Sequence, residues 1–101
     1  MSRSEDQARI WIKKTYPGAF IIKYPDYKQT GLTNSAGIPD YLVIHDGKTF
    51  WIEVKTWKSS SYTPAQLVVF SKMQQCGAVI YVWKKLKRGH DLFIFHSERK
   101  D

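Results

Sequence analysis

The dipeptide Asp46-Gly47, set between two stretches of strand-forming residues, constrains the fold of this chain more than any other feature. A two-residue type I′ hairpin turn needs positive φ at both central residues, and Asp-Gly adopts that conformation readily. Residues 40–45 and 48–57 are therefore predicted to form an antiparallel pair whose register the turn sets. In that register Asp40 lies close to positions 52 and 53, at the open end of the hairpin.

The second strand of this hairpin has two chemically different faces, because strand side chains point alternately to opposite sides of a sheet. One face is apolar enough to be core and carries Phe50, Ile52, Val54 and Thr56; the other carries Trp51, Glu53, Lys55 and Trp57. The Cα atoms of Glu53 and Lys55 are then roughly 7 Å apart. With Asp40 on the neighbouring strand, the hairpin predicts two carboxylates and an ammonium group in one place.

The other segments predict an α/β fold on a mixed sheet flanked by helices, in the order α-β-β-β-α-β-β. Residues 3–15 have helical periodicity, with a capping-box pattern at Ser4 and Gln7. A second capping box at Thr63 and Gln66, with Pro64 at the first helical position, predicts another helix. Further strands are expected at 19–24, 78–84 and 91–96, and a loop at 25–39. With 101 residues, we expect residues 1–101 to form one domain.

The composition narrows the partners and the cellular setting. Sixteen Lys and Arg residues face nine Asp and Glu, a formal net charge of +7, which favours a polyanion, either nucleic acid or an anionic membrane surface. Alternatively, the positive charge only keeps the surface of the protein soluble and binds no specific partner. A single cysteine excludes an internal disulfide, and no apolar run approaches the ~20 residues of a spanning helix. We expect a cytoplasmic protein without a membrane partner.

Clustered carboxylates indicate a metal site, because Asp40 and Glu53 would repel each other without a positive charge between them. A hard divalent cation such as Mg²⁺ takes such oxygen ligands together with substrate phosphate. Lys55 could orient or deprotonate the attacking water, or stabilise charge on phosphate oxygens. Taken singly, Asp40 could be a turn residue after proline, and Glu53 with Lys55 a surface ion pair of little consequence.

Pro39-Asp40, twelve residues and then Glu53-Val54-Lys55 resemble the signature of the PD-(D/E)xK nucleases. The wider pattern, with Gly37-Ile38 before Pro39 and Thr63-Pro64-Ala65-Gln66 after a Ser/Thr loop, is similar to the VRR-NUC (virus-type replication-repair nuclease) branch. The resemblance implies an αβββαβ core with an extra C-terminal strand, and a Mg²⁺- or Mn²⁺-dependent endonuclease. It implies these metal ligands: Glu5 (or the adjacent Asp6), Asp40, Glu53 and the main-chain carbonyl of Val54. The catalytic residues that it implies are Asp40, Glu53, Lys55 and Gln66.

The stand-alone members of this branch resemble Holliday-junction resolvases that act as homodimers. We therefore expect a structure-selective cut in four-way or other branched DNA, in phage or bacterial replication, recombination or repair. A flap, nick or single-strand nuclease is one alternative, and a non-catalytic basic nucleic-acid-binding module is another. The expected DNA-contacting residues are basic side chains beside the site and on a predicted hairpin tip: Lys28, Lys58, Lys85, Lys87 and Arg88.

Overall fold

The structure, a computed structural model, describes residues 3–23 and 37–97, so most of the predicted 25–39 loop, including Lys28, lies outside the described residues. The described elements are α1 (Arg3–Thr15), β1 (Phe20–Lys23), β2 (Tyr41–His45), β3 (Lys48–Thr56), α3 (Pro64–Gln75), β4 (Ile80–Lys85) and β5 (His90–Ile94). Each predicted helix and strand is present, with ends that differ by at most two residues from the expected ones.

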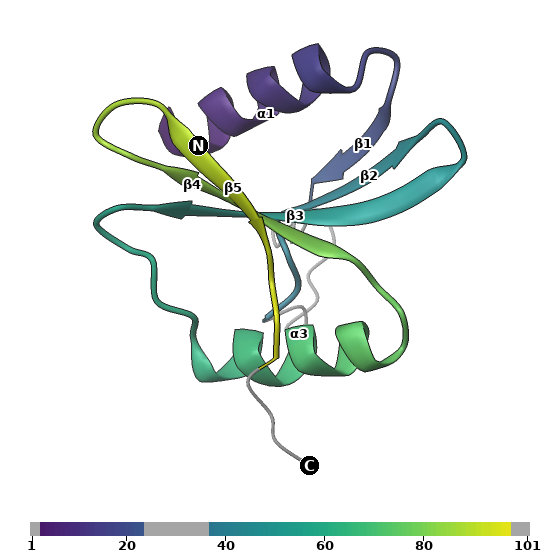
Figure 1. Cartoon of the computed structure of the whole chain (residues 1–101), viewed down its shortest axis with the longest axis vertical. Coiled ribbons are helices and arrows are strands. Elements are labelled where there is room, and N and C mark those ends of the chain that lie inside the picture. Colours follow the sequence, from purple (N-terminus) through teal and green to yellow (C-terminus); the bar gives the residue numbers. More distant parts are fainter. Residues whose placement is uncertain (1–2, 24–36, 98–101) are drawn as a thin grey trace.

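The five strands form one sheet in the order β1-β2-β3-β4-β5. Neighbouring strands are antiparallel except β3 and β4, which are parallel because α3 lies between them in the chain. Helix α1 covers one face of the sheet and α3 the other, which gives three layers (Figure 1). The mixed sheet with flanking helices confirms the predicted fold class, and β5 is the expected extra C-terminal strand.

The hairpin at Asp46-Gly47 has the predicted geometry. The φ angles of Asp46 and Gly47 are 51° and 75°, so both residues adopt the left-handed conformation that a type I′ turn needs. The resulting register pairs Tyr41 with Ile52. Asp40, one residue before Tyr41, therefore lies beside Glu53, as expected.

Two apolar cores, one on each face, hold the layers together. Beneath α1 the core contains Ala8, Ile12, Tyr41, Val43, Phe50, Ile52 and Trp83. Beneath α3 it contains Phe70, Ile80, Val82 and Phe95. The predicted alternation in β3 is confirmed, because Phe50 and Ile52 pack toward α1 while Glu53 and Lys55 contact Gln66 of α3.

The two predicted helix starts have different outcomes. At α3 the capping box is confirmed, with Thr63 Oγ1 accepting from the Gln66 N–H and the Gln66 side chain accepting from the Thr63 N–H. The prediction that Ser4 caps α1 is wrong, because the helix already includes Arg3 and Ser4 lies in its first turn. Glu5 and Asp6 also stand in that turn, where acidic side chains interact favourably with the helix dipole.

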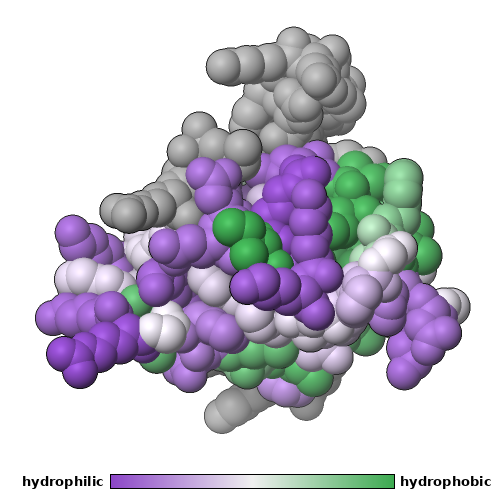
Figure 2. Space-filling view, turned by 90° about the horizontal axis from the view of Figure 1, so that it is seen from above, coloured by the Kyte–Doolittle hydropathy of each residue, from purple (hydrophilic) through white to green (hydrophobic). Residues whose placement is uncertain are grey.

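Hydrophilic residues cover most of the face that α1 occupies. They are densest at the side of the molecule where the β4–β5 turn lies (left in Figures 1 and 2). Among the described helices, none is both long and apolar enough to cross a membrane.

Candidate active site

Asp40 and Glu53 meet where β2 begins, at the middle of β3. The Val54 N–H donates to Asp40 Oδ2 at 2.8 Å, which holds the Asp40 carboxylate against the edge of β3. The Glu53 side chain points toward α3 and is almost fully buried, at 3% exposure. The hairpin register therefore brings the two predicted carboxylates together without help from a distant part of the chain.

Lys55 and Gln66 complete a closed network with Glu53. The Lys55 ammonium lies 3.4 Å from Glu53 Oε2 and donates to Gln66 Oε1 at 2.8 Å and to the Ser61 carbonyl at 2.9 Å. The Gln66 amide group in turn donates to Glu53 Oε2 at 2.8 Å. Every donor of this network is thus held in one orientation, with Lys55 itself only 9% exposed.

Gln66 takes part both in the cap of α3 and in the network with Glu53 and Lys55. Its Oε1 accepts from the Thr63 N–H at 3.0 Å as part of the α3 cap, and from Lys55 on the other side. Because both bonds use the same oxygen, the Nε2 group must face Glu53. The cap of α3 therefore orients the amide in the site.

Burial and their mutual charge affect the ionisation of the two carboxyl groups. Burial, followed by the nearby charge of Asp40, raises the pKa of Glu53 to about 8. Burial also raises the pKa of Asp40, and the Val54 N–H and the charge of Lys23 oppose that rise. The other oxygen of Glu53, Oε1, is buried and has no hydrogen-bond partner. A carboxylate oxygen buried in this way needs either a proton or a cation.

A hard divalent cation fits this donor set. Asp40 and Glu53 supply carboxylate oxygens, and the unpartnered Glu53 Oε1 is the orphaned atom that such an ion would satisfy. The Val54 N–H already faces Asp40, and a strand residue directs its N–H and C=O to the same side. In the described part of the chain, no group of three or more Asp, Glu, His or Cys side chains is arranged to hold a metal ion, so Glu5 does not form such a group with Asp40 and Glu53.

Lys23, a residue that the sequence pattern did not single out, lies between Glu5 and Asp40 and interacts with both. The Lys23 ammonium lies 3.9 Å from Glu5 Oε1 and 3.8 Å from Asp40 Oδ1. Lys23 pairs with Tyr41 across β1 and β2, which sets it beside Asp40. The pairing of the 19–24 strand with the hairpin would have predicted that Lys23 lies beside Asp40. The local sequence pattern does not determine which strands are neighbours, so it did not predict this contact. Asp6, the alternative to Glu5, is exposed.

Gly37 allows the segment before Asp40 to pass close to α3. Its φ is +87°, and a Cβ atom there would lie 2.6 Å from the Ala65 carbonyl oxygen. Only glycine combines that conformation with so close an approach. The glycine of the Gly37–Asp40 motif therefore joins the Asp40 side of the site to the helix that carries Gln66.

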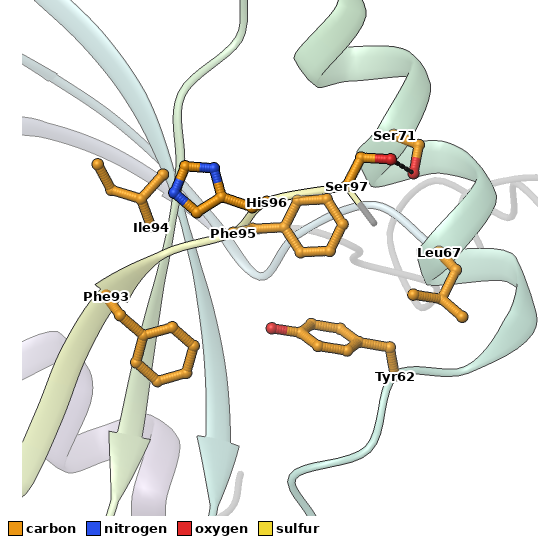
Figure 3. Close-up of a pocket in the computed structure, with 8 residues that line it drawn as sticks. All are labelled: Tyr62, Leu67, Ser71, Phe93, Ile94, Phe95, His96 and Ser97. Atoms are coloured by element: carbon orange, nitrogen blue, oxygen red, sulfur yellow. Dashed lines mark hydrogen bonds between the residues drawn. The ribbon is translucent and has the colours of Figure 1, made fainter. Parts of the chain in front are cut away.

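A hollow in the described residues lies next to this site rather than in it. It has a volume of about 510 Å³ and is lined by residues of α3, β5 and the flanking segments: Tyr62, Leu67, Ser71, Phe93, Ile94, Phe95, His96 and Ser97 (Figure 3). Tyr62 connects the two regions, because its ring centroid lies 5.0 Å from the Lys55 ammonium. The hollow is mainly apolar, so it does not suit a phosphate.

Four of the five predicted DNA-contacting residues are described, and all four lie around one end of the sheet. Lys85 pairs with Thr56 at the end of β3, and Lys87 and Arg88 are exposed in the turn that follows β4. Lys58 is exposed just after β3. The structure thus groups them near the strand that carries Glu53 and Lys55.

No protein-family model matches this chain, and no curated protein matches it closely enough to count as a relative. Among solved structures, the chain is similar to Hjc, a Holliday junction resolvase from the archaeal hyperthermophile Archaeoglobus fulgidus. The two are 27% identical, with a TM-score of 0.60, over 98% of this chain and 81% of Hjc. This likeness confirms a resolvase-like nuclease fold, while membership of the VRR-NUC branch stays a prediction.

Proposed function

We propose that this protein is a metal-dependent endonuclease that hydrolyses phosphodiester bonds in branched DNA, with four-way junctions as its substrate. The observation that carries the proposal is the convergence of Asp40, Glu53, Lys55 and Gln66, with one Glu53 oxygen buried and unpartnered. The likeness to Hjc, a Holliday junction resolvase, supports the choice of substrate.

Asp40, Glu53 and the Val54 carbonyl would hold Mg²⁺ or Mn²⁺ in this site, with Glu5 at its margin. When bound, the cation would polarise the scissile phosphate and lower the pKa of a water molecule. In water a lone lysine contributes only ~1 kcal/mol at 4 Å, whereas this hydrolysis needs a barrier reduction above ~10 kcal/mol. The carboxylates are therefore essential to the proposal, because lysine alone does not explain the activity.

In this proposal, Lys55 stabilises the charge that develops on phosphate oxygens as water attacks phosphorus. Its three contacts, with Glu53, Gln66 and the Ser61 carbonyl, hold the ammonium in place before substrate arrives. A donor that is already oriented needs no reorganisation during the reaction, which is the main source of electrostatic catalysis. Gln66 acts as a positioning residue, because it fixes both Lys55 and Glu53.

The net charge of +7 and the grouped lysines support binding to the phosphate backbone. A clustered pair of carboxylates works against that binding unless a cation neutralises it. A binding module has no need of Asp40 and Glu53 in this arrangement, which favours an enzyme over a non-catalytic module.

We propose that the protein acts as a homodimer, because a four-way junction has two-fold symmetry and resolution needs paired cuts. The surface best suited to a second copy surrounds the hollow of Figure 3. Leu67 on α3 and Phe93 and Ile94 on the edge strand β5 are 42–47% exposed there. An exposed apolar surface of this kind is typical of interfaces. Replacing Leu67 with Glu should shift the dimer to monomer in sedimentation velocity; an unchanged sedimentation coefficient would exclude this surface.

The decisive experiment compares the wild type with Glu53→Ala on labelled four-way junction, flap, nicked duplex, linear duplex and single-stranded DNA. We expect Mg²⁺-dependent cutting of the junction by the wild type, and no cutting by Glu53→Ala, with junction binding retained or tightened. Asp46→Asn is the matched control, because Asp46 is an exposed carboxylate at the far end of the same hairpin. It should cut at the wild-type rate.

Each contrary result has a definite meaning. Cleavage by Glu53→Ala at the wild-type rate would refute the mechanism. Cleavage of flaps or single strands with no action on junctions would refute the resolvase assignment and support the other nuclease specificities. Binding without cleavage of any substrate, with or without Mg²⁺ or Mn²⁺, would identify a non-catalytic module.

A further inference from the structure

Trp57 differs from the other three tryptophans of the chain. Trp83 is buried, and Trp11 and Trp51 pack against the two cores. Trp57 instead leaves 44% of its surface exposed. An exposed indole is a large apolar surface held in water, and none of the roles assigned above uses it.

The position of Trp57 places it next to the candidate active site. The Trp57 N–H donates to the Lys85 carbonyl at 2.8 Å, with the same sequence offset as the bond from the Trp51 N–H to the Val79 carbonyl. Trp57 therefore continues the β3–β4 ladder. Trp57 directly follows Thr56, the last residue of β3, and the alternation of that strand carried one residue further indicates the face of Glu53 and Lys55 for its side chain, roughly 7 Å beyond Lys55 at Cα.

Two cations from different segments lie over the Trp57 ring. The Lys87 ammonium, from the turn after β4, lies 4.7 Å from the ring centroid. The Lys58 ammonium, from the segment after β3, lies 5.3 Å from it. Cation–π contacts at exposed sites are worth only about 0.5–1 kcal/mol, so they leave both lysines free to exchange partners.

We infer that Trp57, Lys58 and Lys87 form a binding site for an unpaired nucleobase of the DNA strand that enters the active site. The inference rests on the proposed function for the identity of the polymer. An indole can stack on any base, and the lysines next to the ring suit the flanking phosphates. In a duplex both faces of a base are covered by its neighbours, so only an unstacked base, such as one splayed out at a branch point, offers a face to Trp57.

The site would act as a substrate-selecting element. It binds one splayed nucleotide a short distance along the strand from the scissile phosphate, and so favours branched over fully paired DNA. Stacking is tolerant of base identity, so the site predicts structure selectivity without sequence selectivity.

The test uses oligothymidylate of about 12 nucleotides, and an abasic strand of the same length, in EDTA so that no cleavage occurs. Fluorescence anisotropy gives the Kd for wild type, Trp57→Phe and Trp57→Leu. Phe keeps a ring face, whereas Leu keeps apolar bulk without one. We expect Trp57→Leu to weaken oligothymidylate binding about 5- to 150-fold, Trp57→Phe much less, and neither to change binding of the abasic strand.

Phe20→Ala is the matched control, because Phe20 is an aromatic residue with 60% exposure on the opposite edge strand, β1. It should bind both strands as the wild type does. Equal affinities for Trp57→Leu and Trp57→Phe would overturn the inference, as would an equal loss on the abasic strand or a wild type that does not bind oligothymidylate. Because this readout needs no cleavage, absence of nuclease activity would refute the proposed function and leave the base site to be judged on binding alone.

Discussion

Replacing Glu53 with Gln should remove a pH dependence of stability that this carboxyl imposes on the metal-free protein. Burial, followed by the charge of Asp40, raises the pKa of Glu53 from an ordinary 4.5 to about 8. Between these values the folded state binds more protons than the unfolded state. The free energy of unfolding must therefore fall as the pH rises through this window.

The change in the free energy of unfolding depends on the pH range between the unfolded and the folded pKa of Glu53. Each pH unit between the two pKa values lowers the free energy of unfolding by at most about 1.4 kcal/mol. Going from about pH 5.5 to about pH 8 thus costs up to about 3 kcal/mol, out of a total of about 5–15 kcal/mol for an ordinary domain. Gln has the shape of Glu but does not titrate, and its amide can donate to Asp40 where Glu53 Oε1 has no partner.

The assay is urea unfolding in EDTA at about pH 5.5, 7 and 8.5, for wild type, Glu53→Gln and the matched control Asp46→Asn. We expect the wild type and Asp46→Asn to lose stability with rising pH, and Glu53→Gln to lose up to about 3 kcal/mol less. Groups that titrate in the same way in all three proteins change their free energies of unfolding equally. These contributions cancel when the proteins are compared at one pH. Adding Mg²⁺ should stabilise the wild type more at pH 8.5 than at 5.5, because the cation competes with the proton. Parallel curves for wild type and Glu53→Gln would refute the reasoning.

Three further perturbations test other parts of the structure. Lys55→Met should lower kcat for junction cleavage by at least about 100-fold with little change in junction Kd, as rapid-quench and binding assays can measure; a normal kcat would remove Lys55 from the mechanism. Gly37→Ala should lower the thermal midpoint more than Gly18→Ala, because both have positive φ but only at Gly37 would the new Cβ meet backbone, 2.6 Å from the Ala65 oxygen. An equal loss would show that the close approach is unimportant. Alanine at Lys85, the last residue of β4, together with alanine at Lys87 and Arg88 in the β4–β5 turn, should reduce the slope of log Kd against log salt by about 0.9 for each lost phosphate contact. An unchanged slope would place these three side chains away from DNA.

Most of the local structure could be predicted because its determinants are local. The Asp46-Gly47 turn sets the register of β2 and β3, and this register alone brings Asp40 beside Glu53. The Thr63 cap likewise depends on four consecutive residues. The prediction of Ser4 as the N-cap of α1 was wrong because neighbouring residues can also begin a helix. Arg3 is as compatible with a helix as Ser4, and α1 includes both.

By itself, the sequence determined the elements, the two faces of β3 and the approach of Asp40 to Glu53, because turn chemistry and strand alternation act over a few residues. Only the tertiary structure decided what surrounds them. It placed Lys23 between Glu5 and Asp40, directed the Gln66 amide at Glu53, and set Lys87 over Trp57. These contacts join segments between 13 and 30 residues apart, and they depend on strand order and helix placement, which no local pattern encodes.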